Sequence, residues 1–186
     1  MKTFLIIVGV IVAIFIIVRI FGKGKLSTVN PINGMNFNGC MGINLGDNWQ
    51  FVLSRMVHLN LISQQEAKEY IDKYAESNRL GSYIFGETFK STAKYNNIDT
   101  IDFRIDGQGK LEEVVINLVP EQTDMSSLLE ICKNTLTQQI GEKPLVIKDE
   151  KMYLLAWNSP DRRSIINIDM SRNTIYVAIS PSMKYF

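Results

Sequence analysis

The longest apolar run of the chain lies at its beginning, where Phe4–Val18 carries no charge and Arg19-Ile20-Phe21 extends the run. At about 1.5 Å of helix rise per residue, these eighteen residues would reach roughly 27 Å, close to the ~30 Å hydrocarbon core of a bilayer. The sequence therefore predicts a single transmembrane anchor over residues 1–22. Its lipid-facing residues would be Phe4, Leu5, Ile6, Ile7, Val8, Ile11, Val12, Ile14, Phe15, Ile16, Ile17 and Val18.

The charges on either side of this run bear on retention and orientation. A cleaved signal peptide needs a small-residue cleavage site, but Arg19, Lys23 and Lys25 stand where a peptidase would cut. We therefore predict a retained anchor, and a secreted domain after cleavage is the alternative. Only Lys2 and the terminal amine precede the run, so the positive-inside rule favours the cytoplasmic side for the rest of the chain by one or two charges.

The stretch after the anchor, residues 23–41, has neither a helical nor a strand period and is rich in Asn, Gly and Ser. This composition predicts a linker. An ordered segment is an equal alternative over Gly34–Met41, because Met35, Phe37 and Met41 could pack against a domain.

Two amphipathic helices are predicted next. Asp47 or Asn48 is a candidate N-cap, and the apolar residues that follow recur at helical spacing up to Leu59. Ser63 and Glu66 have the spacing of a capping box, which begins a helix that ends near Asn78.

The period then changes to two. Apolar and polar residues alternate over 101–106, a turn is predicted at Asp106–Gly109, and Leu111–Val119 forms the returning strand. Tyr83–Tyr95 is predicted as a further strand of the same antiparallel sheet.

The second part of the chain repeats this order. Asp124 is the predicted cap of a helix that Gly141 ends, and strands are expected at Met152–Trp157, Ser164–Met170 and Thr174–Ser180. The fold class is therefore α+β, with about three helices on one face of an antiparallel sheet in a two-layer domain over residues 42–186. Its halves, 42–120 and 121–186, form a possible tandem repeat of helix and strands.

The opening Gly42-Ile43-Asn44-Leu45-Gly46-Asp47, followed by an amphipathic helix and hairpins, resembles small envelope domains typified by β-lactamase inhibitor protein and the small lipoprotein of outer-membrane assembly. The chain departs from the lipoprotein because it lacks a usable lipidation cysteine. The resemblance implies a role in protein binding rather than catalysis, and it assigns a role to no single residue.

Charge and composition narrow the partners. The chain has 20 basic and 19 acidic residues, and removing the four basic residues of 1–25 leaves 16 against 19, or a net charge of −3. A neutral-to-acidic domain lacks the basic patch that nucleic acid requires. The expected partners are therefore the lipid bilayer and an unidentified protein. Gly9 and Ala13 have a small-x-x-x-small spacing, which could also bring two anchors together as a homodimer.

Candidate chemistry is sparse. His58 is the only histidine, Cys132 is expected to be buried on a helix, and Cys40 is expected in flexible chain, where it could react or pair with Cys132. The carboxylates Asp99, Asp102, Asp106, Glu112 and Glu113 lie on predicted strands, with Asp102, Arg104 and Asp106 interpreted as one solvated, charge-balanced face. No cofactor is predicted. The sequence favours a non-catalytic, membrane-anchored binding or scaffolding domain, and the alternative is an anchored enzyme that uses Cys40 or His58.

Overall fold

The computed structural model describes residues 31–79, 87–120, 123–148, 153–171 and 174–182. The predicted anchor, Phe4–Val18, lies outside these residues and stays a prediction. Among the helices that are described, none is both long and apolar enough to cross a bilayer. Within the described chain the fold is α+β, with three α-helices and two antiparallel sheets.

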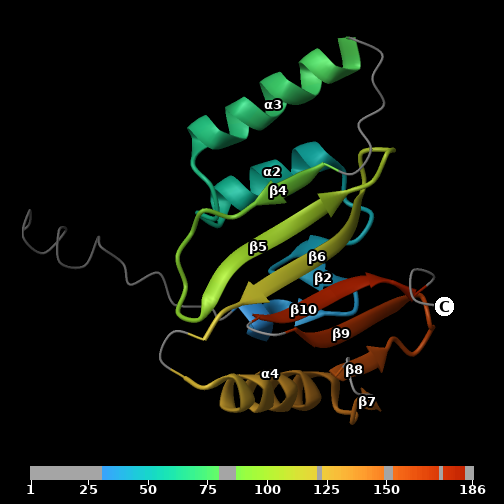
Figure 1. Ribbon diagram of the computed structural model, residues 1–186. Coiled ribbons are helices and arrows are strands. Elements are labelled where there is room, and N and C mark those ends of the chain that lie inside the picture. Colours follow the sequence, from blue (N-terminus) through green and yellow to red (C-terminus); the bar gives the residue numbers. More distant parts are fainter. Residues whose placement is uncertain (1–30, 80–86, 121–122, 149–152, 172–173, 183–186) are drawn as a thin grey trace, which may run out of the picture.

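The larger sheet has seven strands in the order β4-β5-β6-β10-β9-β8-β7, and every neighbouring pair is antiparallel. Figure 1 shows the sheet running from β4 at one end to β7 at the other. The strands are β4 (Thr88–Lys90), β5 (Ile98–Ile105), β6 (Leu111–Leu118), β7 (Leu145–Lys148), β8 (Tyr153–Asn158), β9 (Ser164–Ser171) and β10 (Thr174–Pro181).

Two antiparallel meanders make up this sheet. The first is β4-β5-β6 and the second is β7-β8-β9-β10, and the last strand of each pairs with the last strand of the other. In that pairing Val114 lies opposite Ile179 and Leu118 lies opposite Ile175. The sheet is therefore continuous across the two halves that the sequence predicts.

Local signals in the sequence explain the helices. α2 (Trp49–His58) begins after Asn48, whose side chain accepts a hydrogen bond from the Phe51 amide. α3 (Gln64–Arg79) begins with the predicted capping box: the Ser63 amide donates to Glu66 at 2.7 Å, and the Glu66 amide donates to the Ser63 hydroxyl at 3.1 Å.

The third helix, α4 (Met125–Ile140), connects the two meanders. Asp124 accepts a hydrogen bond from the Ser127 amide at the start of α4, and Gly141 ends the helix with a φ of 80°. This positive φ favours glycine, which has no Cβ to clash. In Figure 1, α2 and α3 lie at the β4 end of the sheet and α4 lies at the β7 end.

One face of the sheet, the inner face, forms the hydrophobic core. Its side chains alternate along each strand and pack with buried residues of α2 and α4, including Leu53, Met56, Leu129 and Leu136. These shared contacts place α2 and α4 against the inner face. The strand residues of the inner face are Ile101, Phe103, Ile105, Val114, Ile116, Leu118, Leu155, Trp157, Ile166, Ile168, Ile175, Val177 and Ile179.

The segment before α2 is ordered from Pro31 onward. It forms a 3₁₀ turn, η1 (Pro31–Gly34), and a small sheet of β1 (Met35–Asn36), β2 (Gly39–Cys40) and β3 (Ile43–Asn44). Ile32, Met35, Cys40 and Ile43 belong to the core. Of the two alternatives for Gly34–Met41, the structure shows the ordered one, because the Met and Ile side chains between the polar residues find apolar contacts.

Two details of the predicted strands differ from the structure. The strand expected over Tyr83–Tyr95 covers only Thr88–Lys90 among described residues, since residues 80–86 are outside them. The chain leaves the sheet after Lys90, where the Ser91 hydroxyl and the Thr92 amide both donate to Leu61 O. Strand β7 lies in a part of the chain for which the sequence predicted none.

The small sheet supplies a stability prediction at Gly39. A Cβ there would lie 2.0 Å from Ile43 O and 2.7 Å from Asn44 Cα, both backbone atoms that cannot move aside without breaking the β2–β3 pairing. We expect Gly39→Ala to lower the free energy of unfolding by about 3 kcal/mol or more. Gly46→Ala is the control, because its Cβ meets nothing within 4 Å and only its φ of +86° costs about 1 kcal/mol. Urea unfolding of the full chain measures both, and equal losses would contradict the packing argument.

Candidate functional site

The face of the large sheet that points away from the core, here called the outer face, is unusually well buried. None of its residues belongs to the hydrophobic core. Even so, Val115, Ala178 and Ala156 are each only 4% exposed, and Glu113 is 3% exposed. The outer face consists of Thr100, Asp102, Arg104, Glu113, Val115, Asn117, Leu154, Ala156, Asn158, Ile165, Asn167, Asp169, Tyr176, Ala178 and Ser180.

Three buried oxygen atoms on this face have no hydrogen-bond partner. They are Asp102 Oδ1, Asn167 Oδ1 and Ser180 Oγ, and their residues are 8%, 6% and 0% exposed. Among the described residues the one other buried side-chain polar atom without a partner is Arg55 Nε. A buried polar group left unpaired costs about 1–3 kcal/mol, so a cluster of them on one face needs an explanation.

The sheet register places two of these residues, Asp102 and Asn167, on one line across the strands, and Ser180 lies off this line, opposite Ile165. Asp102 lies opposite Val115, Val115 opposite Ala178, Ala178 opposite Asn167, and Asn167 opposite Ala156. With about 4.8 Å between strands, Asp102 and Asn167 are roughly 14 Å apart. Short side chains fill the positions between them, so the line is a low strip of the outer face.

Two polar contacts hold the Asp102 end of the strip. Asn117 Nδ2 donates to Thr100 Oγ1 at 2.6 Å and to Asp102 Oδ2 at 3.3 Å, which fixes one oxygen of the carboxylate and leaves the other unpaired. Beside them Arg104 Nη1 contacts Glu113 Oε2 at 2.5 Å. The guanidinium of Arg104 therefore already has a carboxylate partner, and Asp102 does not share it.

The chemistry of the strip is that of a hydrogen-bond acceptor. A carboxylate oxygen and an amide oxygen only accept, and a hydroxyl can accept or donate. Asp169, which is half-buried, adds a second carboxylate beside Tyr176 on the neighbouring strand. A ligand that fits the outer face must therefore bring donors, and it must reach across four strands.

The structure corrects the predicted solvated face of Asp102, Arg104 and Asp106. Asp102 is buried, because Val115 and the second meander lie beside it. Asp106 lies in the β5–β6 turn, where its Oδ1 accepts hydrogen bonds from the Gln108 and Lys110 amides, both at 2.8 Å. Only Arg104 is exposed as predicted.

The cysteines and the histidine are not brought together into a site. Cys40 was expected in flexible chain, but it is fully buried in β2, and its Sγ donates to Pro31 O at 3.4 Å. Cys132 is also buried, as predicted, and the two thiols are free rather than paired. His58 is exposed at the end of α2. Within the described residues there is no group of three or more His, Cys, Asp or Glu side chains that could hold a metal ion.

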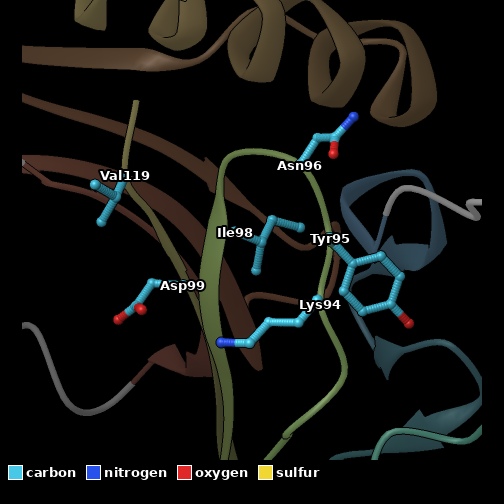
Figure 2. Close-up of a pocket in the computed structure, with 6 residues that line it drawn as sticks. All are labelled: Lys94, Tyr95, Asn96, Ile98, Asp99 and Val119. Carbon is cyan, nitrogen blue, oxygen red and sulfur yellow. The ribbon is translucent and has the colours of Figure 1, made fainter. Parts of the chain in front are cut away.

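Two hollows lie elsewhere on the described surface. One, of about 270 Å³, is lined by Lys94, Tyr95, Asn96, Ile98, Asp99 and Val119. Figure 2 shows Lys94 and Asp99 extending toward the same side, while the ring of Tyr95 points away from Asp99. The other, of about 830 Å³, lies between the small sheet and the β8–β9 turn and includes Asn38, Asn44, Asp161 and Arg163. Neither contains a buried, unpaired polar atom, which distinguishes them from the outer face.

Burial of the two thiols predicts their reactivity. Desolvation raises the pKa of Cys40 and of Cys132 to about 12, so at pH 8 only about one thiol in ten thousand is ionised. We expect neither cysteine of the native chain to react with a maleimide within minutes, and both to react in guanidinium. His58→Cys, on the exposed end of α2, is the control that reacts in the native state. Labelling of Cys40 as fast as this control would contradict its burial.

Comparisons with known proteins do not add to this geometry. Searches against protein-family models, curated proteins and solved structures gave no match to this chain. The functional inference therefore depends on the outer face and on the residues that form it.

Proposed function

We propose that this protein is a non-catalytic binding or scaffolding domain, held at a membrane by residues 1–22, which takes a polypeptide partner on the outer face of its seven-stranded sheet. The observation that carries the proposal is the pair of unpaired oxygen atoms of Asp102 and Asn167, whose residues are 8% and 6% exposed. A bound partner with hydrogen-bond donors would pair with these two atoms and remove the cost of leaving them unpaired, whereas Ser180 is fully buried and takes no part.

The span of these oxygen atoms favours a polypeptide over a small metabolite. A ligand that pairs with both Asp102 and Asn167 must cover roughly 14 Å across the strands. An extended segment of about four or five residues has that length, and its backbone N–H groups supply donors at regular intervals. With Arg104 paired to Glu113, the carboxylates of Asp102 and Asp169 favour Arg, Lys or Asn side chains in the partner.

The burial of Cys40 weakens one of the observations that motivated the alternative of an anchored enzyme. Cys40 is buried with a raised pKa, so it is not an accessible nucleophile. His58 is exposed and is not among the residues that line either of the two hollows. A general base also needs a positioned partner, and the binding hypothesis needs neither residue.

Membrane attachment rests on the sequence alone. The uncharged run Phe4–Val18 is long enough for one span, and the basic residues after it favour the cytoplasmic side for the domain. The resemblance to small envelope domains, carried by Gly42–Met56 and by the order of elements, also implies a protein-binding role. A secreted domain after signal cleavage is the competing hypothesis.

Site-specific crosslinking tests the outer face. A photoreactive p-benzoylphenylalanine replaces Tyr176, which is 36% exposed beside the strip, or Phe51 on α2, which is 44% exposed. We expect a discrete protein adduct from position 176 and none of the same size from position 51. Absence of an adduct at 176 in the cells that express the full chain would contradict the proposal.

The adduct must also depend on the acceptor strip. Asp102→Asn keeps the shape but places an amide N–H₂ where the partner needs an acceptor, so we expect the adduct at 176 to fall by about tenfold or more. Asp99→Asn is the matched control, because Asp99 is an exposed carboxylate on the same strand and should leave the adduct unchanged. An adduct equally strong in both variants would show a contact that does not use the strip.

Deletion of residues 1–22 tests the anchor independently. We expect the intact chain to resist extraction by alkaline carbonate and the shortened chain to appear in the soluble fraction, because one apolar span holds a protein in the bilayer. N-terminal sequencing of the intact protein should show that it begins at Met1 or Lys2. A mature protein that begins after Gly22 would instead support the secreted alternative.

A further inference from the structure

The outer edge of β7 is an unprotected end of the large sheet. Strand β7 pairs with β8 on one side, and no strand of the described chain pairs with its other side. A strand in this position presents unpaired backbone N–H and C=O groups to any chain that approaches it. Figure 1 shows β7 at the margin of the fold, beyond β8.

The side chains of β7 are apolar and exposed on both faces. Leu145, Val146 and Ile147 are 56%, 54% and 40% exposed, and they are three of the eight large hydrophobic residues exposed in the described chain. Leu145 lies opposite Ala156 and therefore on the outer face, whereas Val146 lies opposite Leu155 on the core side. An edge of this kind is a site for strand pairing.

The opposite edge of the sheet is protected, which makes the exposure of β7 informative. Strand β4 has only three residues and ends on the exposed Lys90. The Lys90 amide, which points away from β5, donates to the Tyr70 hydroxyl of α3 at 3.3 Å. Strand β4 therefore has a charged and capped edge, whereas β7, with four residues, has neither a charged side chain nor such a cap over Leu145–Ile147 in the described chain.

We propose that β7 pairs with β7 of a second copy of this chain, antiparallel and about a two-fold axis that passes through the Val146 pair perpendicular to the sheet. Such an axis reverses the strand direction and keeps each side chain on its own face of the sheet. Val146 then faces Val146 of the second copy, and Leu145 faces Ile147. The two seven-stranded sheets become one continuous sheet.

Charge and backbone chemistry select this register among the two-fold possibilities. A register centred on Ile147 would place Val146 opposite Lys148, and one centred on Leu145 would place Val146 opposite Pro144, which has no N–H to donate. Centred on Val146, all three paired positions are apolar. The two Lys148 residues are then four positions apart, or roughly 14 Å, which exceeds the ~8 Å screening length at physiological salt.

The small size of the contact sets its strength. Four residues from each copy bury much less than the ~1,200 Å² of standard stable interfaces, so the pairing is weak and transient in solution. Confinement of two copies to one membrane raises their effective concentration and favours it. The pairing places the two outer faces on the same side of the joint sheet, and it does not depend on what those faces bind.

Disulfide trapping of the full chain in membranes tests the register. The native cysteines are both buried, so Val146→Cys adds the one accessible thiol of the described chain. Residues opposite each other on antiparallel strands have Cα atoms about 4.5–5.5 Å apart, inside the range of about 4.4–6.8 Å that a disulfide bond spans. On oxidation to a disulfide by a copper–phenanthroline catalyst and oxygen, we expect at least about fivefold more covalent dimer for Val146→Cys than for Ile71→Cys. Ile71, on α3, is similarly exposed at 45%.

A second variant keeps the test independent of thiol chemistry. Val146→Lys places two ammonium groups against each other at the two-fold axis, and because Val146 is 54% exposed the substitution leaves the core of each copy unchanged. In membranes that hold the full chain, we expect homodimer, measured as energy transfer between donor-labelled and acceptor-labelled copies, for the unchanged protein and for Ile71→Lys, and none above background for Val146→Lys. Equal dimer in all three proteins, or no covalent Val146→Cys dimer above the Ile71→Cys control, overturns the proposal. A Val146→Cys adduct to a different protein without homodimer overturns it as well.

Discussion

The pairing of β6 with β10 is the contact on which the rest of the fold depends. Among the described strands it is the one place where the two meanders exchange hydrogen bonds, so the position of each meander relative to the other follows from it. On the inner face its apolar pairs, such as Ile116 with Val177, are fully buried. Loss of these apolar contacts between β6 and β10 would separate the meander near α2 from the meander near α4.

The same seam creates the outer face. Val115 and Ala178 lie opposite each other at its centre. Asp102 lies beside Val115 and Asn167 lies beside Ala178, so the two polar residues flank a pair of short side chains. Two residues from different halves of the chain thus share one surface because of one strand pairing. Neither half alone would contain the strip, which explains why the candidate site lies where the halves meet.

The parts of the fold that the sequence predicted have local signals. Ser63 with Glu66, and Asp124 with Gly141, marked helix ends because capping involves residues only a few positions apart. Alternation over residues 101–106 likewise marked β5. The burial of Asp102 had no such signal, since it depends on neighbours across the sheet that periodicity does not specify. Cys40 was misplaced because a two-residue strand among Asn and Gly residues is too short to show a period.

The ordered start of the described chain would limit how far the domain could stand from an anchor over residues 1–22. Pro31 O accepts a hydrogen bond from Cys40 Sγ, and Asn33 O accepts one from Gln139 Nε2 of α4 at 2.7 Å, so the chain is fixed to the domain from its first described residues. With an anchor that ends at Gly22, eight residues remain, and even fully stretched they reach about 28 Å. The domain would then stay close to the bilayer, and any partner on its outer face would be held within a few nanometres of the lipid surface.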